Sequence, residues 1–512
     1  MNRKTGVILS YVLLVVEIFS TLLFTPFLIS TLGQAEYGIY QLVISITAYL
    51  ALLDLGVGNS VIRYIAKYRA NNDKQAQRRF LGITTIYYAI IAVIVLIVGG
   101  IILHNFSSIF AKGLTDSEIE LAKKLFTVTI FGTAFSLATS SFSNVVIAYE
   151  RFSISKGTTI ILTIVKVLVS ALALAMGMGS LAIVVIHLLI SVIARGIYIC
   201  YVIFKLNIIP LFKDFDFKFI REVATYSSFI LLQMIASNIN GLANQVLLGI
   251  FAEGAAVIIG IYGIGAQILQ YFKTLGSHFT SVLMPGLVKL VESGADSKAY
   301  EKEMIRISRI VFMALSLVWV VFAVNGQDFV VLWAGEENKK AYYVALVLML
   351  PQMMSYVQGV GYQLLQAMSK HKIPSIITSV SAILNVTITI ILIQWNPLAG
   401  AVAGGFIALF LCEYVVMTFM YKKLIGIRLT VYYKGMFKGT LPCVLVTAVV
   451  GVLFRMLDFN RFGWLGFVVN CGAMLAIYGV TMLLYGMNDY EKNLIFKPLK
   501  KILKKFHIVK EV

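Results

Sequence analysis

The chain has 512 residues, of which 59% are hydrophobic and 13% are charged, and its mean hydropathy is +0.89. A soluble domain could not bury that much apolar surface, so a soluble globular protein is excluded. The net charge of +19 would suit a nucleic-acid-binding protein, but the basic residues lie mostly in short segments between apolar stretches, which argues against a basic binding face.

Apolar stretches long enough to cross a bilayer, roughly 20 residues each, recur along the whole chain. They predict an all-α, polytopic membrane protein with about fourteen transmembrane helices. The first stretch follows Asn2, Arg3 and Lys4 as a signal sequence would, but it is too long and lacks a small-residue cleavage site, so we expect an uncleaved first helix. In chain order, the predicted helices cover 6–31, 37–62, 81–104, 124–149, 157–177, 180–204, 225–250, 255–284, 307–332, 341–368, 375–394, 397–421, 440–459 and 463–485.

The loops between the predicted helices alternate in their content of Lys and Arg. Loops on the side of the N-terminus hold most of these residues, and loops on the other side hold few. Because cytoplasmic loops carry the excess of basic residues, the alternation predicts that both termini are cytoplasmic. The basic C-terminal segment, 491–512, is then expected at the inner membrane surface, where it would be attracted to anionic lipids.

An internal repeat is visible in the sequence. A Gly-Ile-Tyr triplet occurs at 38–40 and again at 260–262, and the segment that follows the fourth helix, 152–155, resembles 370–374, which follows the tenth. An even number of helices separates the copies, so they share one orientation in the membrane. We therefore expect two parallel six-helix lobes, 1–210 and 211–421, an extra helix pair at 422–490 and the basic cytoplasmic tail at 491–512.

Several predicted helices carry polar residues at helical spacing. A helix that faces only lipid should be apolar all round, so such stripes indicate a wet cavity or a polar helix interface. Amide side chains both donate and accept hydrogen bonds, as binding of a sugar requires. The alternative is that these residues hold neighbouring helices together. The amides expected to line a polar lumen and contact sugar are Gln233, Asn240, Asn244, Gln267, Gln270, Gln352 and Gln363.

Ionisable residues inside the predicted helices are rarer. A charge at the bilayer centre costs about 2.5 to 3.5 kcal/mol on insertion scales, so it needs a partner or water. We expect Lys273 and Lys166 near mid-membrane, with Arg63 and Arg195 at the inner entrance, to bind an anionic headgroup such as diphosphate. The carboxylates of Glu17 and Asp54 would bind a coupling cation or proton, or hold the cationic residues in place. The simpler interpretation of both sets is internal ion pairs.

No motif for enzyme chemistry is found. The chain has no P-loop, its five histidines lack metal-ligand spacing, and its four cysteines lie in apolar segments without CxxC spacing. The sequence therefore predicts a protein that is not an enzyme, with no catalytic residues, metal site or cofactor.

The N-terminal part of the chain carries a family resemblance. The segments TPFLISTLG (25–33), EYGIY (36–40), LLDLGVG (52–58) and RYIAKY (63–68) resemble the Wzx-like flippases, the polysaccharide-transporter branch of the MOP superfamily. The resemblance implies a flippase that moves an undecaprenyl-diphosphate-linked oligosaccharide from the inner to the outer leaflet for surface polysaccharide biosynthesis. It also implies a bacterial inner (plasma) membrane, alternating access driven by an ion gradient or the membrane potential, and Na⁺ or H⁺, membrane lipids and other polysaccharide-assembly proteins as partners.

Two other functions are compatible with a polytopic helical protein. A cation-coupled multidrug exporter of the MATE type would share the fold, but it would need a more aromatic or acidic cavity for organic cations. A membrane glycan polymerase or ligase would carry its catalytic residues in a large external loop, whereas the longest such loop here covers only about 104–123.

Overall fold

The computed structural model describes residues 3–54, 56–212, 217–281, 284–368, 370, 372–456, 462–494 and 496. Regular structure in these ranges is helical throughout. The helices of the first half are α1 (Arg3–Ala51), η1 (Leu52–Asp54), α2 (Val57–Ala70), α3 (Lys74–His104), α4 (Phe106–Phe110), α5 (Asp116–Ala138), α6 (Ser140–Ala148), α7 (Phe152–Ala175), α8 (Ser180–Cys200) and η2 (Tyr201–Lys205). The following helices are α9 (Phe217–Phe251), α10 (Ala255–Ser281), α11 (Met284–Glu292), α12 (Ser297–Ala334), η3 (Glu336–Asn338), α13 (Ala341–Val357), α14 (Gly359–Ala367), α15 (Lys372–Ile393) and α16 (Pro397–Ala408). The chain continues through η4 (Leu409–Val416), α17 (Met417–Ile425), α18 (Leu429–Phe437), α19 (Thr440–Arg455), α20 (Trp464–Thr481) and η6 (Met482–Gly486).

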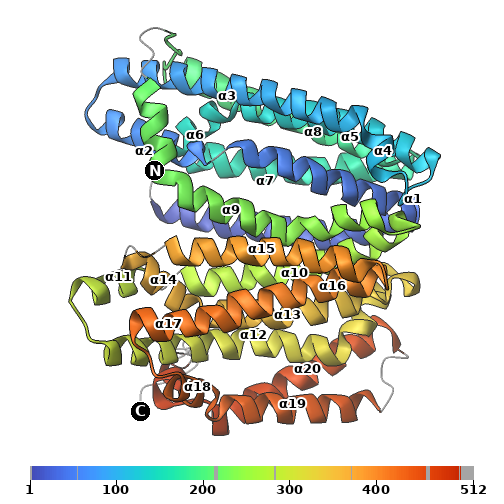
Figure 1. Ribbon diagram of the computed structural model, residues 1–512, viewed down its shortest axis with the longest axis vertical. Helices are drawn as coiled ribbons and strands as arrows, with labels where there is room; N and C mark the ends of the chain where they lie inside the picture. Colours follow the sequence, from blue (N-terminus) through green and yellow to red (C-terminus); the bar gives the residue numbers. More distant parts are fainter. Residues whose placement is uncertain are drawn as a thin grey trace, which may run out of the picture. The chain divides into compact units, whose positions relative to one another are not determined.

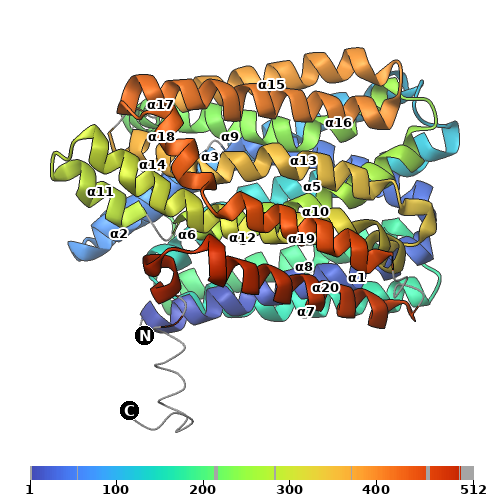
Figure 2. The same cartoon turned by 90° about the horizontal axis from the view of Figure 1, so that it is seen from below.

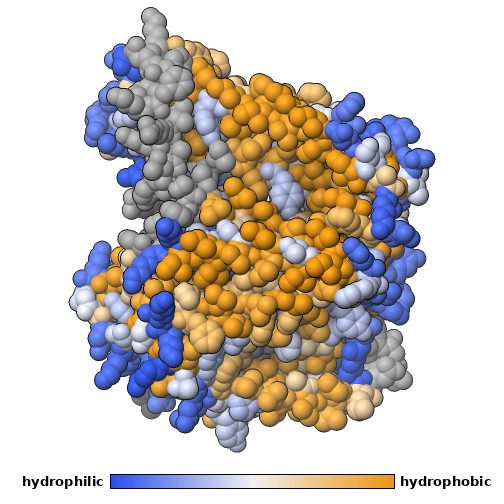
Figure 3. All heavy atoms as spheres, viewed as in Figure 1, coloured by the Kyte–Doolittle hydropathy of each residue, from blue (hydrophilic) through white to orange (hydrophobic). Residues whose placement is uncertain are grey.

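Among the described residues, eleven helices are long and apolar enough to cross a membrane, or thirteen if each of two bent helix pairs counts as one span. The first of them contains two predicted spans, because Gly33, with φ 76° and ψ 169°, interrupts α1 between them. Hydrophobic residues cover the middle of the visible face, and hydrophilic residues gather towards the helix ends (Figure 3). The predicted all-α, polytopic membrane fold is confirmed.

The chain forms two compact units. Unit 1 comprises Met1–Gly263 and Thr378–Gly405, and unit 2 comprises Ile264–Ile377 and Phe406–Val512. In unit 1, α5 packs between α3 and α8 (Figure 1). In unit 2, α12 packs against α13, α18, α19 and α20 (Figure 2). The lobe boundaries expected from the sequence repeat stay a prediction, and the basic tail from 497 onward lies outside the described residues.

Helix boundaries repeat along the chain at a nearly constant offset. The fourth span breaks at Thr139, between α5 and α6, and the tenth breaks at Gln358, between α13 and α14. The next helices, α7 and α15, begin at Phe152 and Lys372, which are separated by nearly the same offset. The carboxylates of Asp73 and Asp296, at a similar offset, each cap a helix by accepting a hydrogen bond from the backbone N–H three positions on, at 2.8 and 2.9 Å. These matches support the internal repeat inferred from the sequence.

Gly38 and Gly260, the first residues of the two Gly-Ile-Tyr triplets, are in close backbone contact in unit 1. A Cβ atom on Gly38 would lie 1.7 Å from the carbonyl oxygen of Ala256 and 3.0 Å from the backbone nitrogen of Gly260. A Cβ atom on Gly260 would lie 2.8 Å from the carbonyl oxygen of Gln34 and 3.6 Å from the nitrogen of Gly38. Only glycine permits this backbone approach.

We predict that Gly38→Ala destabilises the protein, because the added methyl group would overlap backbone atoms, and overpacking typically costs about 1 to 3 kcal/mol. The measurement is thermal unfolding of the purified variant in detergent, where we expect the midpoint to fall by several degrees. The matched control is Gly100→Ala in α3, because a Cβ atom there meets no atom within 4 Å. Equal stability of the two variants would contradict the close contact.

Candidate functional site

A charged cluster in unit 1 surrounds the break in the fourth span. Arg195 of α8 donates hydrogen bonds to the hydroxyl groups of Ser136 and Ser143, at 2.7 and 2.8 Å. These serines lie on α5 and α6, on either side of the break at Thr139, so the break lets both hydroxyls reach one guanidinium. The carboxylate of Asp54 in η1 interacts electrostatically with the same arginine.

Asp54 lies beside two tyrosines and an arginine. Its carboxylate interacts with Tyr87 and Tyr88 of α3 as well as with Arg195, and the interaction with Tyr88 includes a side-chain hydrogen bond. The carboxylate is therefore held by Tyr88 and by the charge of Arg195 together.

A second charged cluster in unit 1 joins three other helices. Lys166 of α7 interacts electrostatically with Glu17 of α1 and with His187 of α8. Glu17 is exposed, whereas Lys166 and His187 are partly buried. The structure thus places Glu17, a predicted ion-coupling residue, close enough to interact electrostatically with Lys166, a predicted headgroup-binding residue.

The predicted sugar-binding amides of α9 take part in packing within unit 1. Asn244, which is only 2% exposed, donates from Nδ2 to the hydroxyl of Tyr262 at 3.0 Å and to the carbonyl oxygen of Ala401 at 2.7 Å. Asn240 donates to the hydroxyl of Ser381 at 3.3 Å. Gln233, in the middle of α9, is partly buried.

Polar residues of α15 join this cluster, and sequence reasoning missed them. Ser381, Asn385 and Thr389 are fully buried at four-residue spacing, and Thr389 donates to the Oδ1 atom of Asn385 at 3.2 Å. The Nδ2 atom of Asn385 has no hydrogen-bond partner among the described residues. The four-residue spacing is the signal that could have identified this stripe.

Unit 2 contains another acid–base pair and most of the other predicted amides. Lys273 of α10 is partly buried and interacts electrostatically with Glu413, which lies in the π-helical turn η4. Gln267 donates to the hydroxyl of Tyr271 on the same helix at 2.8 Å, and Gln270 is exposed. The partly buried Gln352 and Gln363 lie on α13 and α14. Arg63 belongs to unit 1, where it is exposed on α2.

A buried arginine connects the last helix pair to the rest of unit 2. Arg309 of α12 donates from Nε and Nη2 to the two carboxylate oxygens of Glu491, at 2.6 and 3.1 Å. It also donates to the carbonyl oxygens of Gly435, Lys438 and Gly486, at 2.9, 2.7 and 2.7 Å. These acceptors belong to the end of α18, to the residue that follows α18 and to the end of η6. We call this set the Arg309 clamp.

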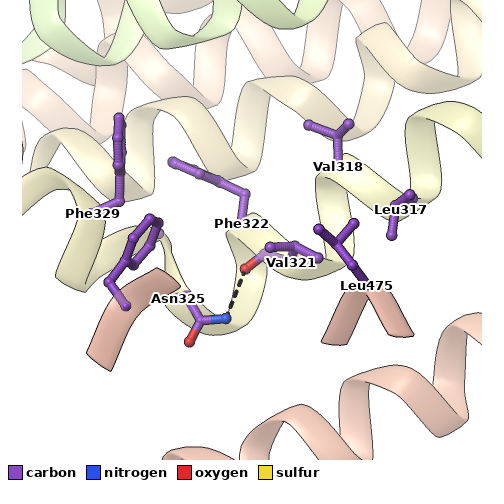
Figure 4. Close-up of a pocket in the computed structure, with 9 residues that line it drawn as sticks. Leu317, Val318, Val321, Phe322, Asn325, Phe329 and Leu475 are labelled. Atoms are coloured by element: carbon purple, nitrogen blue, oxygen red, sulfur yellow. Dashed lines mark hydrogen bonds between the residues drawn. The ribbon is translucent and has the colours of Figure 1, made fainter. Parts of the chain in front are cut away.

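An apolar pocket of about 290 Å³ lies between α12 and α20 in unit 2. Its one polar side chain is that of Asn325, which donates to the carbonyl oxygen of Val321 at 3.5 Å (Figure 4). Asn325 also donates to the Sδ atom of Met474 at 3.1 Å. Such a pocket accepts hydrocarbon but offers little to a sugar. Its lining residues are Leu317, Val318, Val321, Phe322, Asn325, Gly326, Phe329, Phe467 and Leu475.

Together, these arrangements offer two kinds of chemistry. Arginine and lysine side chains inside the spans can bind anionic groups such as phosphates. Neighbouring amides and hydroxyls can donate and accept hydrogen bonds to a hydroxyl-rich molecule.

Comparisons with known proteins bear on the family and on the fold. The model of a family described as polysaccharide biosynthesis protein matches residues 3–291. The fold is similar to that of the lipid II flippase MurJ in an inward closed conformation, with a TM-score of 0.66 and 13% identity over 96% of this chain and 99% of that one. It is also similar to an inward-facing multidrug resistance MATE family transporter of the MOP superfamily, with a TM-score of 0.62 and 15% identity over 80% of this chain and 94% of that one. No curated protein sequence matches the chain.

We predict that Glu491→Ala destabilises the protein by about 3 kcal/mol or more, because it leaves the buried charge of Arg309 without its counter-ion. The measurement is thermal unfolding of the purified protein, together with protease sensitivity of the α19–α20 pair. Asp489→Ala is the control, since Asp489 is exposed two positions away. A Glu491→Ala protein as stable as the control would show that the clamp contributes little.

Proposed function

Because the chain belongs to the polysaccharide biosynthesis protein family, we propose that it is a flippase for a lipid-diphosphate-linked oligosaccharide. The proposed direction is from the inner to the outer leaflet of a bacterial inner membrane, with both termini cytoplasmic and undecaprenyl diphosphate as the carrier. The observation that carries the proposal is the presence of cationic side chains, Arg195 and Lys273, within spans that also present amides and hydroxyls. A substrate that joins a diphosphate to a sugar chain needs both kinds of group.

The proposed roles follow the chemistry of each group. Arg195, Lys273 and Lys166 bind the diphosphate, and the exposed Arg63 attracts it at the inner entrance. Amides that remain accessible, such as Gln270, bind the sugar. The lipid tail stays in the bilayer, because moving hydrocarbon through a polar site would be unfavourable.

We also propose alternating access driven by an ion gradient or by the membrane potential, with Glu17 and Asp54 as the candidates for ion coupling. The exposure of Glu17 and its interaction with Lys166 support this role, because a cation that binds the carboxylate would change the charge that the lysine experiences.

Export of organic cations is the second candidate, because a MATE transporter has a similar fold. The cationic side chains of Arg195 and Lys273 would repel such substrates. Transport of a cationic dye by the reconstituted protein, with no movement of lipid-linked glycans, would favour this alternative.

Leaflet exchange of defined lipid-diphosphate glycans in proteoliposomes tests the proposed function. We predict that Lys273→Ala lowers the exchange rate at least tenfold, because a hydrogen bond to a charged group contributes about 1.5 to 3 kcal/mol. Lys273→Arg keeps the charge and should retain part of the rate. A fully active Lys273→Ala variant, produced at normal level, would rule out the headgroup role of this lysine.

The same assay with imposed sodium and proton gradients tests ion coupling. We predict that Glu17→Gln abolishes the response of the exchange rate to the gradient of the coupling ion, since the amide can neither carry the charge nor titrate. The control is the exposed Glu120→Gln on α5, whose carboxylate pairs with Lys124 in the next turn of its own helix. An unchanged gradient response would remove Glu17 as a coupling residue.

A further inference from the structure

The guanidinium of Arg195 spans a helix break by binding two serine hydroxyls. Ser136 on α5 and Ser143 on α6 are two turns apart, which in a straight α-helix would separate them by about 10.5 Å along the axis. Two oxygens that accept from the terminal nitrogens of one guanidinium, at 2.7 and 2.8 Å, lie within roughly 8 Å of each other. The break at Thr139 therefore brings the two serines close enough for one arginine to bind both.

Most of the donors of Arg195 remain available. A guanidinium carries five N–H groups, and Arg195 uses two of them, both on neutral hydroxyls, so three have no acceptor among the described residues. The carboxylate of Asp54 acts on Arg195 electrostatically and accepts from none of these donors. Because Arg195 is only partly buried, its remaining N–H groups can take a ligand.

Arg309 provides a contrast within the same chain. All five of its N–H groups have acceptors, two of them the carboxylate oxygens of Glu491 and three of them backbone carbonyl oxygens. Its charge is neutralised by that carboxylate, and its side chain is only 8% exposed. An arginine saturated in this way holds helices together, and a ligand could bind it only by breaking the Arg309 clamp. Arg195 is not saturated.

A helix break does not by itself need a cation. In unit 2, the break at Gln358 is held by neutral groups, because Nε2 of Gln358 donates to the hydroxyls of Thr418 and Tyr433, both at 2.7 Å. The hydroxyl of Ser308 also donates to the carbonyl oxygen of Val357, at 2.7 Å. Stabilisation of a break is therefore not a sufficient reason for an arginine in the corresponding place in unit 1.

We propose that Ser136 and Ser143 are positioning residues, which fix the orientation of the Arg195 guanidinium so that its remaining N–H groups bind a phosphate of the substrate. This inference rests on the proposed function, because it takes the substrate to be a diphosphate. Hydroxyls suit the role because they hold the plane of the guanidinium without neutralising its charge. A planar fork that is already oriented loses less conformational entropy when it binds.

Binding of inorganic diphosphate to the full-length protein tests this positioning. Nanodiscs of zwitterionic lipid keep anionic headgroups from competing, and titration calorimetry gives the affinity. We expect Ser136→Ala and Ser143→Ala each to weaken binding about fivefold, and the double variant about tenfold or more, because each orienting hydrogen bond is lost. Ser136→Thr and Ser143→Thr keep the hydroxyl and should bind within about threefold of the unmodified protein.

Arg195→Lys separates orientation from charge. Lysine keeps the positive charge but has a single donor nitrogen in place of the planar fork, so we expect diphosphate binding to weaken about tenfold. Ser140→Ala is the matched control and should leave the affinity unchanged. Ser140 lies in the same break, but its hydroxyl donates to the carbonyl oxygen of Ser136, at 3.2 Å, and does not contact Arg195.

The exchange assay with lipid-diphosphate glycans distinguishes positioning from damage to the fold. The two alanine variants should raise KM and leave kcat nearly unchanged, since they weaken binding of the headgroup. Their thermal unfolding midpoints should stay close to that of Ser140→Ala. A lower kcat together with a lower unfolding midpoint would show that the serines serve only the packing of α5, α6 and α8, and would overturn the inference.

The inference is also wrong if the alanine variants bind diphosphate as tightly as the unmodified protein, or more tightly, since the serines would then be bystanders or competitors. Equal weakening by Ser140→Ala, or no measurable binding to any of these proteins, would contradict it as well. Failure of the proposed function is a separate result: the unmodified protein would move no lipid-linked glycan, while diphosphate binding would still depend on Ser136 and Ser143.

Discussion

The constraint on which this structure depends is that a charge surrounded by hydrocarbon needs a partner of opposite sign. In unit 2 the partners form ion pairs between different helices, Arg309 with Glu491 and Arg455 with Asp328, and each pair also holds those helices together. Electrostatic interactions that are not resolved as ion pairs join Glu17 with Lys166, Asp54 with Arg195 and Lys273 with Glu413.

Helix boundaries recur along the chain at a nearly constant offset, as the predicted repeat would require. Gly38 and Gly260, which occupy the same place in the two Gly-Ile-Tyr triplets, contact each other, and the breaks at Thr139 and Gln358 lie at the same offset. A break in a helix exposes backbone N–H and C=O groups and redirects side chains. Within a membrane such a break is stable only where protein or water forms hydrogen bonds with those groups. The Arg195 cluster forms at such a break.

Much of this fold could be predicted from the sequence, because hydropathy depends on local composition and the repeat can be recognised from short motifs. Which of the amides are buried and which are exposed could not be predicted. Asn244 and Gln270 both lie on polar stripes, yet the first is buried against Ala401 and the second is exposed, since tertiary packing decides which face of a helix is covered. The contact of Arg309 with Glu491 has no local signal either, because 182 residues separate the two side chains.

The Arg309 clamp also has a consequence for biogenesis. Arg309 precedes its carboxylate partner by 182 residues, so the ribosome synthesises the arginine long before Glu491. Until Glu491 is present, the guanidinium must remain hydrated or be bound by the insertion machinery, and α12 cannot reach its final packing. The contact can form only after residue 491 has been synthesised, so unit 2 acquires its final helix packing late in translation.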